Sequence, residues 1–262
     1  MAVGRQDFLR FVRTEYVDNA TKRSLKKQDQ FVTLTEHGIS WASENRQKAI
    51  LAGVAAVVAI LAIVGGYVLY QSRTVAAQTA FGEAMETYQT PLVTPGQPLP
   101  PGMKTFASAT ERAKAADAQF SAVAQKYGLT KPGKLALYFS GLCLMEEGQN
   151  SSAEETLKKV AGGWDHDLSA LGKLSLAQLY EQTGRDAQAA DIYNELGKGN
   201  SLTVPGTLAQ LQLADMYTSE GKKDKAKEIY AKLKDQDKDA KGQPGPAATV
   251  AEQKLNPKAA QQ

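Results

Sequence analysis

The strongest pattern along the chain is an uninterrupted apolar stretch at residues 49–70, AILAGVAAVVAILAIVGGYVLY, which contains no charged side chain. Eleven of its 22 residues are Val, Ile or Leu. A helix of this length rises about 33 Å, close to the ~30 Å hydrocarbon core of a bilayer. A helix that is apolar on every face needs either lipid or a large protein core around it. The pattern therefore predicts a single transmembrane helix over residues 49–70.

Charges on the two sides of this stretch predict its orientation. Residues 1–48 hold nine Lys or Arg against six Asp or Glu, whereas Arg73 is the one basic residue among the 30 residues that follow the stretch. Because Lys and Arg are concentrated in cytoplasmic segments, we expect a cytoplasmic basic arm at residues 1–48 and an outer C-terminal segment. A cleavable signal peptide is the alternative. The 48-residue leader and the 22-residue apolar stretch both exceed its usual ranges, which favours an uncleaved anchor.

Small residues recur along one face of the predicted membrane helix. They follow one another at steps of 3, 4, 3 and 4, and are Ala52, Ala55, Ala59, Ala62 and Gly66. Such a ridge lets a second helix approach closely within a membrane, so these residues are candidates for membrane helix packing. Since six of the 22 residues are Ala, a ridge that arises by chance is an equally good interpretation.

The helical pattern continues beyond residue 70 and is then interrupted by prolines. Helical spacing is kept by Ala77, Phe81, Ala84 and Tyr88. Residues 91–103 hold five of the ten prolines, and we expect an exposed proline-rich insertion there because proline breaks helices. Helical spacing resumes at Ala113 and lasts to Tyr127. Residues 75–127 are therefore predicted to form a helical pair with the insertion at its turn.

One pattern occurs three times in the C-terminal half. Gly148, Gly184 and Gly221 align at periods of 36 and 37 residues. A small residue stands seven positions before each glycine, and Leu or Tyr stands four positions before it. Ala stands five positions after each glycine, and a large residue stands nine positions after it. In chain order these are Gly141, Leu144, Ala153 and Leu157, then Ala177, Tyr180, Ala189 and Tyr193, then Ala214, Tyr217, Ala226 and Tyr230.

This spacing is typical of stacked helical hairpins. Small residues let the two helices of a hairpin pack closely, glycine ends the first helix in a left-handed turn, and the large residue fills the gap to the next hairpin. We therefore expect an all-α fold, with the transmembrane helix followed by a hairpin solenoid over residues 71–234. Residues 235–262 hold no large apolar residue except Val250 and Leu255, and we expect a disordered tail there.

Side chains suited to catalysis are scarce. The chain has two histidines and one cysteine, Cys143, which lies in an apolar run and is interpreted as a buried structural thiol. Asp165, His166 and Asp167 lack the further ligands of a metal site, and helix capping explains them better. We expect no catalytic residues, metal, cofactor or small-molecule substrate. Residues 71–262 hold 22 basic and 22 acidic residues, so no nucleic-acid partner is expected either.

Stacked hairpins present a concave surface that is lined by their first helices. In the repeat register the lining residues are Leu135, Tyr138, Leu142 and Met145, then Leu171, Leu174 and Gln178, then Leu208, Leu211 and Asp215. A groove of this kind, mostly apolar at one end and polar at the other, suits an extended or helical polypeptide. The alternative is that neighbouring hairpins or the helix from residue 75 cover several of these residues.

The repeat resembles the tetratricopeptide repeat, whose small, aromatic, alanine and aromatic positions match these offsets. A basic arm that ends in Trp41, Glu44, Asn45 and Arg46, followed by one span and a helical-repeat domain, is similar to the YfgM-like group of bacterial tetratricopeptide proteins. This resemblance implies a single-pass protein of the bacterial inner membrane with its repeat domain in the periplasm. It also implies an ancillary role at the Sec translocon, with a periplasmic chaperone or an emerging client polypeptide as partner.

Two other functions fit the same order of features. In the first, the arm binds a cytoplasmic regulator and releases it when the outer domain senses envelope stress. In the second, the repeat domain coordinates envelope assembly or cell division. Each of these functions still requires a membrane-tethered scaffold that works through protein–protein interaction.

Overall fold

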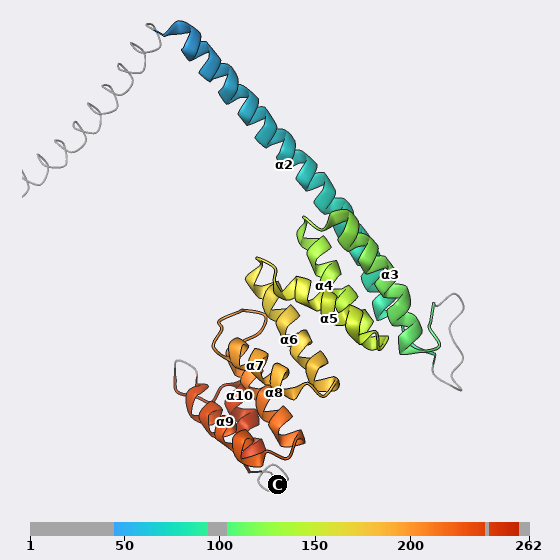
Figure 1. The fold of residues 1–262 in the computed structure, drawn as a ribbon, viewed down its shortest axis with the longest axis vertical. Coiled ribbons are helices and arrows are strands. Elements are labelled where there is room, and N and C mark those ends of the chain that lie inside the picture. Colours follow the sequence, from blue (N-terminus) through green and yellow to red (C-terminus); the bar gives the residue numbers. More distant parts are fainter. Residues whose placement is uncertain (1–44, 94–103, 239–240, 257–262) are drawn as a thin grey trace, which may run out of the picture. The chain divides into compact units, whose positions relative to one another are not determined.

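A long apolar helix begins the part of the chain that the structure describes. The computed structural model describes residues 45–93, 104–238 and 241–256, and the predicted arm lies outside it except for its last four residues. Helix α2, Arg46–Gln89, is 44 residues long and contains the whole apolar stretch (Figure 1). The chain divides into two compact units, Met1–Leu69 and Tyr70–Gln262, and α2 contributes to both.

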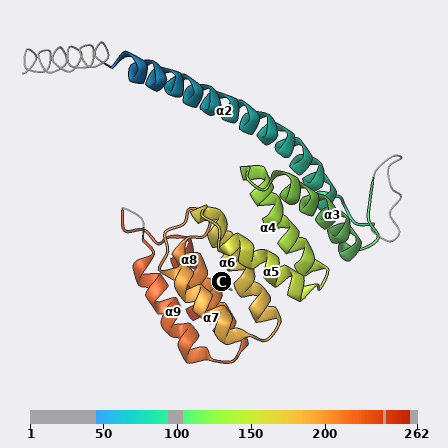
Figure 2. The ribbon, with the colours of Figure 1, turned by 45° about the horizontal axis from the view of Figure 1, so that its top comes forward.

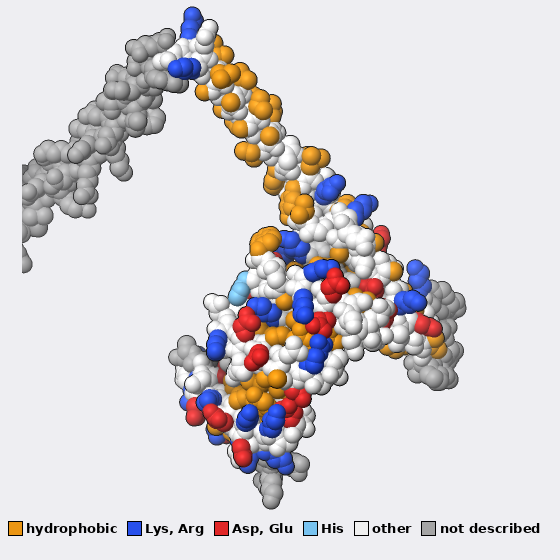
Figure 3. Space-filling model, viewed as in Figure 1, with side chains coloured by type: hydrophobic (Ala, Val, Ile, Leu, Met, Phe, Trp, Pro, Cys, Tyr) orange, Lys and Arg blue, Asp and Glu red, His pale blue; other side chains and the backbone are white. Residues whose placement is uncertain are grey.

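The apolar stretch of α2 is not covered by protein in the first unit. From Ile50 to Leu69, every large apolar side chain is more than half exposed. Figure 3 shows a band of hydrophobic side chains along this part of α2, whereas Lys, Arg, Asp and Glu are abundant on the other helices. Helix α2 is therefore long and apolar enough to cross a membrane, and it differs from the core helix of a soluble protein, which is mostly buried.

Helices that pack in chain order form the second unit. After the last part of α2 come α3 (Ala109–Tyr127), α4 (Lys131–Glu146), α5 (Asn150–Ala161), α6 (His166–Gln182), α7 (Asp186–Gly197), α8 (Gly206–Ser219), α9 (Lys223–Gln236) and α10 (Pro246–Leu255). Each helix from α3 onward packs mainly on its neighbours in the chain, as Figure 2 shows for α4 to α9. The described residues form isolated β-bridges but no strand, and the all-α prediction is confirmed.

The three aligned glycines end the first helix of each hairpin, as predicted. The φ angles of Gly148, Gly184 and Gly221 are 75°, 70° and 77°. In each turn the backbone N–H of the residue after the glycine donates a hydrogen bond to the carbonyl oxygen of the residue four positions before the glycine. The three distances are 2.9, 2.7 and 2.8 Å. This is the Schellman type of helix ending, which glycine adopts readily because it has no Cβ.

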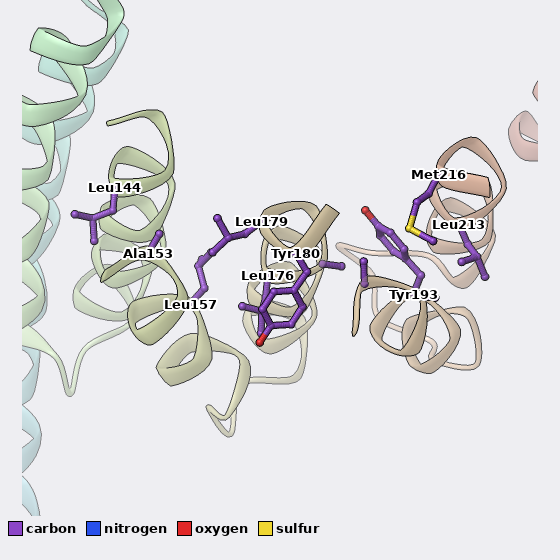
Figure 4. Packing of buried hydrophobic residues seen from close by; sticks show 12 residues of the cluster. Leu144, Ala153, Leu157, Leu176, Leu179, Tyr180, Tyr193, Leu213 and Met216 are labelled. Carbon is purple, nitrogen blue, oxygen red and sulfur yellow. The ribbon is translucent and has the colours of Figure 1, made fainter. Parts of the chain in front are cut away.

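The alanines and large residues of the repeat form the core between hairpins. Leu157 of α5 and Tyr193 of α7 are fully buried and share one cluster with residues of α6 and α8. Figure 4 shows Leu157 beside Leu179 of α6, and Tyr193 beside Met216 of α8. The repeat alanines are buried as well: Ala153, Ala189 and Ala226. The second helix of each hairpin therefore fills the gap to the next hairpin, as the spacing predicts.

Close contact between α5 and α6 depends on one glycine. A Cβ on Gly172 of α6 would lie 2.8 Å from the backbone nitrogen of Ala161 and 2.8 Å from Cγ1 of Val160. Both atoms belong to the end of α5, so the two hairpins meet at this point almost backbone to backbone. Any larger residue at position 172 would push α6 away from α5.

The last part of α2 and helix α3 form the predicted additional pair. Phe81 and Tyr88 of α2 contact Phe120 of α3, with ring centroids 5.6 and 6.2 Å apart, and Phe120 stacks on Phe139 of α4 at 5.3 Å. The guanidinium of Arg112, near the start of α3, lies 5.7 Å from the Tyr88 ring. Toward the end of α3, Val123 lines a shared cleft of about 450 Å³ with Ala80. Helix α3 therefore runs antiparallel to α2.

The two ends of the proline-rich insertion are held side by side. The N–H of Val93 donates to the carbonyl oxygen of Phe106 at 2.9 Å, and the N–H of Phe106 donates to that of Pro91 at 3.2 Å. Residues 94–103 lie outside the described part of the chain. The bridge closes the turn between α2 and α3, so an insertion at this place leaves the helical pair intact.

Helix α10 corrects the expectation of a disordered tail over residues 235–262. Ala247, Ala248 and Ala251 of α10 are buried against a cluster that includes Tyr230 and Leu233 of α9. The expectation considered only large apolar residues, whereas alanines let a short helix pack closely against its neighbours. Helix α10 packs mainly on α9 and less on α8, as α6 packs on α5 and α4. It therefore takes the position of the first helix of a further hairpin.

Candidate protein-binding surface

The predicted groove residues lie on the first helices of three successive hairpins. Helix α4 carries Leu135, Tyr138, Leu142 and Met145, α6 carries Leu171, Leu174 and Gln178, and α8 carries Leu208, Leu211 and Asp215. Leu208 is exposed, Leu211 is buried, and the other eight residues are half-buried. The stacking of hairpins therefore brings these helices together in the expected order, but it uses part of their apolar surface.

Three groove residues of α4 and α6 take part in packing between hairpins. Tyr138, Met145 and Leu174 lie against the cluster that contains Leu157 and Tyr193. The hydroxyl oxygen of Tyr138 lies 3.3 Å from the hydroxyl oxygen of Ser175 on α6. Because each of the three side chains is only half-buried, one side stays open for an apolar contact. Contact of this strip on α4 and α6 with a polypeptide side chain therefore stays a prediction.

Helix α10 occupies the end of the groove that α8 provides. Leu211 belongs to the cluster that the α10 alanines cover. Asp215 accepts hydrogen bonds from the Tyr230 hydroxyl at 2.6 Å and from the Lys254 ammonium of α10 at 2.7 Å. The predicted polar end is therefore satisfied within the chain, and Leu208 is the exposed apolar residue that α8 offers.

A half-buried network of polar side chains fixes two hairpins to one another through Glu154 of α5. Its carboxylate accepts hydrogen bonds from Arg185 at 2.7 Å and from the Tyr180 hydroxyl at 3.1 Å, and it pairs with Lys158 at 2.7 Å. The hydrogen bond from Lys158, followed by that from Arg185, lowers the pKa of Glu154 to about 2. The guanidinium of Arg185 also lies 4.2 Å from the Tyr180 ring. This network joins the α4–α5 hairpin to the α6–α7 hairpin.

The thiol and the acidic loop residues have structural surroundings. Cys143 is fully buried, and burial raises the pKa of its thiol to about 12, which confirms the interpretation as a structural residue. The Asp165 carboxylate accepts from the N–H of Leu168 at 3.1 Å and caps α6, as expected. Asp167 accepts from the Ser201 hydroxyl at 2.8 Å and from the N–H of Leu202 at 2.9 Å. Among the described residues, no cluster of three His, Cys, Asp or Glu side chains is placed to hold a metal.

The small-residue ridge of α2 is open along its length. Ala52, Ala55, Ala59, Ala62 and Gly66 are all exposed in the first unit. A Cβ on Gly66 would meet nothing within 4 Å. The ridge therefore stays a prediction of helix packing, with room on α2 for the close approach that it requires.

The chain was compared with protein families, with curated proteins and with solved structures. A family model described as "Tetratricopeptide repeat-like domain" matches residues 40–256. This match includes most of the chain, and the protein belongs to that family. Neither a curated protein nor a solved structure matches. Repeat domains of this class are typically non-enzymatic scaffolds for protein–protein interaction.

Two features of this surface were missed in the sequence. Helix α10 has a helical spacing of Ala248, Ala251 and Leu255 that follows Pro246 at its start, and this pattern was detectable. The contact between Lys134 and Trp164 joins the start of α4 to the α5–α6 loop, 30 residues further along the chain, with the ammonium 3.7 Å from the ring. No local pattern indicates it, because it depends on how one hairpin stacks on the next.

Proposed function

We propose that this protein is a membrane-tethered scaffold that binds polypeptides outside the cytoplasm. In this proposal residues 1–48 are a cytoplasmic arm, residues 49–70 cross the bacterial inner membrane, and residues 71–256 form a periplasmic repeat domain. The observation that carries the proposal is the order of features along the chain. An apolar stretch with exposed side chains precedes the stacked hairpins, and the tetratricopeptide repeat-like family match covers both. The excess of Lys and Arg before the stretch supports the orientation.

For the partner, we propose the Sec translocon together with a periplasmic chaperone or an emerging client. The resemblance to the YfgM-like group supports this assignment. A client that emerges from a channel is unfolded and exposes apolar side chains, and the half-buried strip on α4 and α6 suits such a chain. The ridge on α2 offers a second surface, where a membrane partner packs helix against helix.

Site-specific photo-crosslinking in native membranes tests this proposal. A photoreactive amino acid is placed at Tyr138, Leu174 or Leu208 on the groove, and crosslinked proteins are identified by mass spectrometry. Matched controls carry the probe at Glu155 and Lys227, which are exposed on the second helices α5 and α9. We expect translocon subunits, chaperones or secretory proteins from the groove positions and not from the controls. Recovery of no envelope or secretory protein from any groove position contradicts the proposal.

A further inference from the structure

Three apolar side chains on the loops between hairpins are more exposed than any other large apolar residue described. Leu129 follows α3, Trp164 follows α5 and Leu202 follows α7, and their exposed fractions are 86%, 84% and 88%. The most exposed large residue of the apolar stretch in α2, Leu51, reaches 73%. Single exposed apolar residues are common on protein surfaces. One on each of the three loops α3–α4, α5–α6 and α7–α8 is a pattern that needs a physical explanation.

The three loops lie next to one another on one edge of the second unit. In Figure 1 the α3–α4, α5–α6 and α7–α8 loops follow one another along one side of the unit, opposite the turns that contain Gly148, Gly184 and Gly221. Direct contacts join them: Lys134 at the start of α4 lies over the Trp164 ring, and Asp167 at the start of α6 binds Ser201 and Leu202. We refer to residues 128–131, 162–165 and 198–205 as the loop edge.

The loop edge lies at the end of the unit where the apolar stretch of α2 finishes. The second unit begins with Tyr70 of α2, and α3 runs antiparallel to α2. The end of α3, and the α3–α4 loop after it, are therefore on the same side of the unit as Tyr70. The bridge between Val93 and Phe106 and the glycine turns are on the other side. In a membrane-anchored chain, the loop edge is therefore on the side of the second unit that holds Tyr70, where the chain leaves for the membrane segment.

The chemistry of the loop edge is that of side chains found at membrane interfaces. Trp and Leu supply apolar groups, and Lys126, Lys131 and Lys134 surround Leu129 in the sequence. Lysines extend their apolar stems along a membrane surface and keep the ammonium in the headgroup layer. The acidic residues nearby are already engaged, since Asp165 caps α6 and Asp167 holds the α7–α8 loop. Trp prefers the headgroup level because its ring is both apolar and a hydrogen-bond donor.

We propose that the loop edge rests on the outer surface of the bilayer, with Leu129, Trp164 and Leu202 inserted at headgroup level. The proposal rests on the proposed membrane anchor. Insertion of three separate side chains is weak by itself, but the tether keeps the domain at a high local concentration beside the lipid, so a weak contact is sufficient. The contact holds the domain in one orientation, with the glycine turns facing away from the membrane.

Spin labels on the full chain in lipid nanodiscs test the proposal. Single cysteines replace Leu129, Trp164 or Leu202 in a Cys143→Ala background, and matched controls carry the cysteine at Gln149, Gln182 or Lys223 on the opposite edge. Collision rates with oxygen, which concentrates in lipid, and with a water-soluble nickel complex are measured. We expect severalfold higher oxygen-to-nickel ratios at the loop edge than at the controls. Equal ratios at the two edges overturn the proposal.

A label at Ala59→Cys separates the failure of this proposal from failure of the anchor. If that label is in lipid while the loop labels are in water, the anchor stands and the loop-edge proposal falls. If the Ala59→Cys label is also in water, the membrane anchor itself is wrong. Loop labels that are mobile in nanodiscs but immobilised in native membranes show a protein contact instead, which also overturns a lipid contact.

Fluorescence of Trp164 gives a second measurement that leaves the core unchanged. The chain has two tryptophans, so Trp41→Phe makes Trp164 the single one. In lipids that carry bromine near the headgroup, we expect quenching and a blue shift of Trp164 emission relative to the same protein in detergent. Emission that is unaffected by bromine and quenched by aqueous iodide contradicts insertion.

Discussion

At the scale of single residues, Gly172 sets the distance between two hairpins. A Cβ at this position meets the backbone nitrogen of Ala161, which no rotamer change relieves. We expect Gly172→Ala to lower the free energy of unfolding by about 1–3 kcal/mol, as overpacking of a close contact does. The measurement is chemical denaturation followed by circular dichroism.

The matched control for this change is Gly82→Ala in α2. Gly82 is exposed and a Cβ there meets nothing within 4 Å. Because alanine favours a helix by about 1 kcal/mol over glycine, this variant is expected to be as stable as the wild type or more stable. If the two alanine variants change the free energy of unfolding by the same amount, the close approach of α6 to α5 is not what requires glycine at position 172.

Glu154 makes the stability of the domain depend on pH. Its pKa is held at about 2, below the ordinary value of 4.5, because Lys158 and Arg185 donate to the ionised carboxylate. The folded state therefore binds this proton less well than the unfolded state does. The stabilisation is complete above pH 4.5 and is lost as the pH falls from 4.5 toward 2.

We expect Glu154→Gln to lower the free energy of unfolding at pH 7 by about 1–2 kcal/mol, after allowance for solvent around the carboxylate. The difference from the wild type should shrink when the same denaturation is repeated at pH 3. Glu155→Gln is the control, since Glu155 pairs only at the surface with Lys159. A difference that is constant between pH 3 and pH 7 contradicts the role of the charge.

At the scale of elements, α10 is an integral part of the repeat domain. Ala251 is fully buried between α10 and its neighbours. We expect Ala251→Glu to detach α10, because a charged side chain does not fit in that space, and to speed amide hydrogen exchange in α9 by tenfold or more. Gln253→Glu, on the exposed face of the same helix, should leave exchange in α9 unchanged. Equal exchange in both variants means that α10 does not protect α9.

The elements of the repeat were predictable because local spacing determines them. Gly148, Gly184 and Gly221 repeat with buried alanines and large residues at fixed offsets, and the same offsets produce the hairpins. Helix α10 was not predicted because it packs through alanines, which contribute little to a count of large apolar residues. The burial of Leu211 and the ion pair of Asp215 with Lys254 depend on α10, so the state of the groove at α8 was not predictable either.

At the scale of the whole molecule, the charge around the apolar stretch predicts opposite locations for the two ends. We expect a phosphatase that is active only in the periplasm to be active when fused after residue 256 and inactive when fused before residue 46. A fluorescent protein that folds only in the cytoplasm should give the reverse pattern at the two sites. Phosphatase activity at the earlier site alone would invert the proposed orientation.

The position of α10 also bears on whether copies of this protein associate with one another end to end. A row of stacked hairpins has an open apolar end unless something closes it, and an open end is a template for another such row. Here α10 closes that end from within the same chain. We therefore expect a form that is shortened before Pro246 to expose Leu211 and Leu233 and to polymerise end to end more readily than the intact chain.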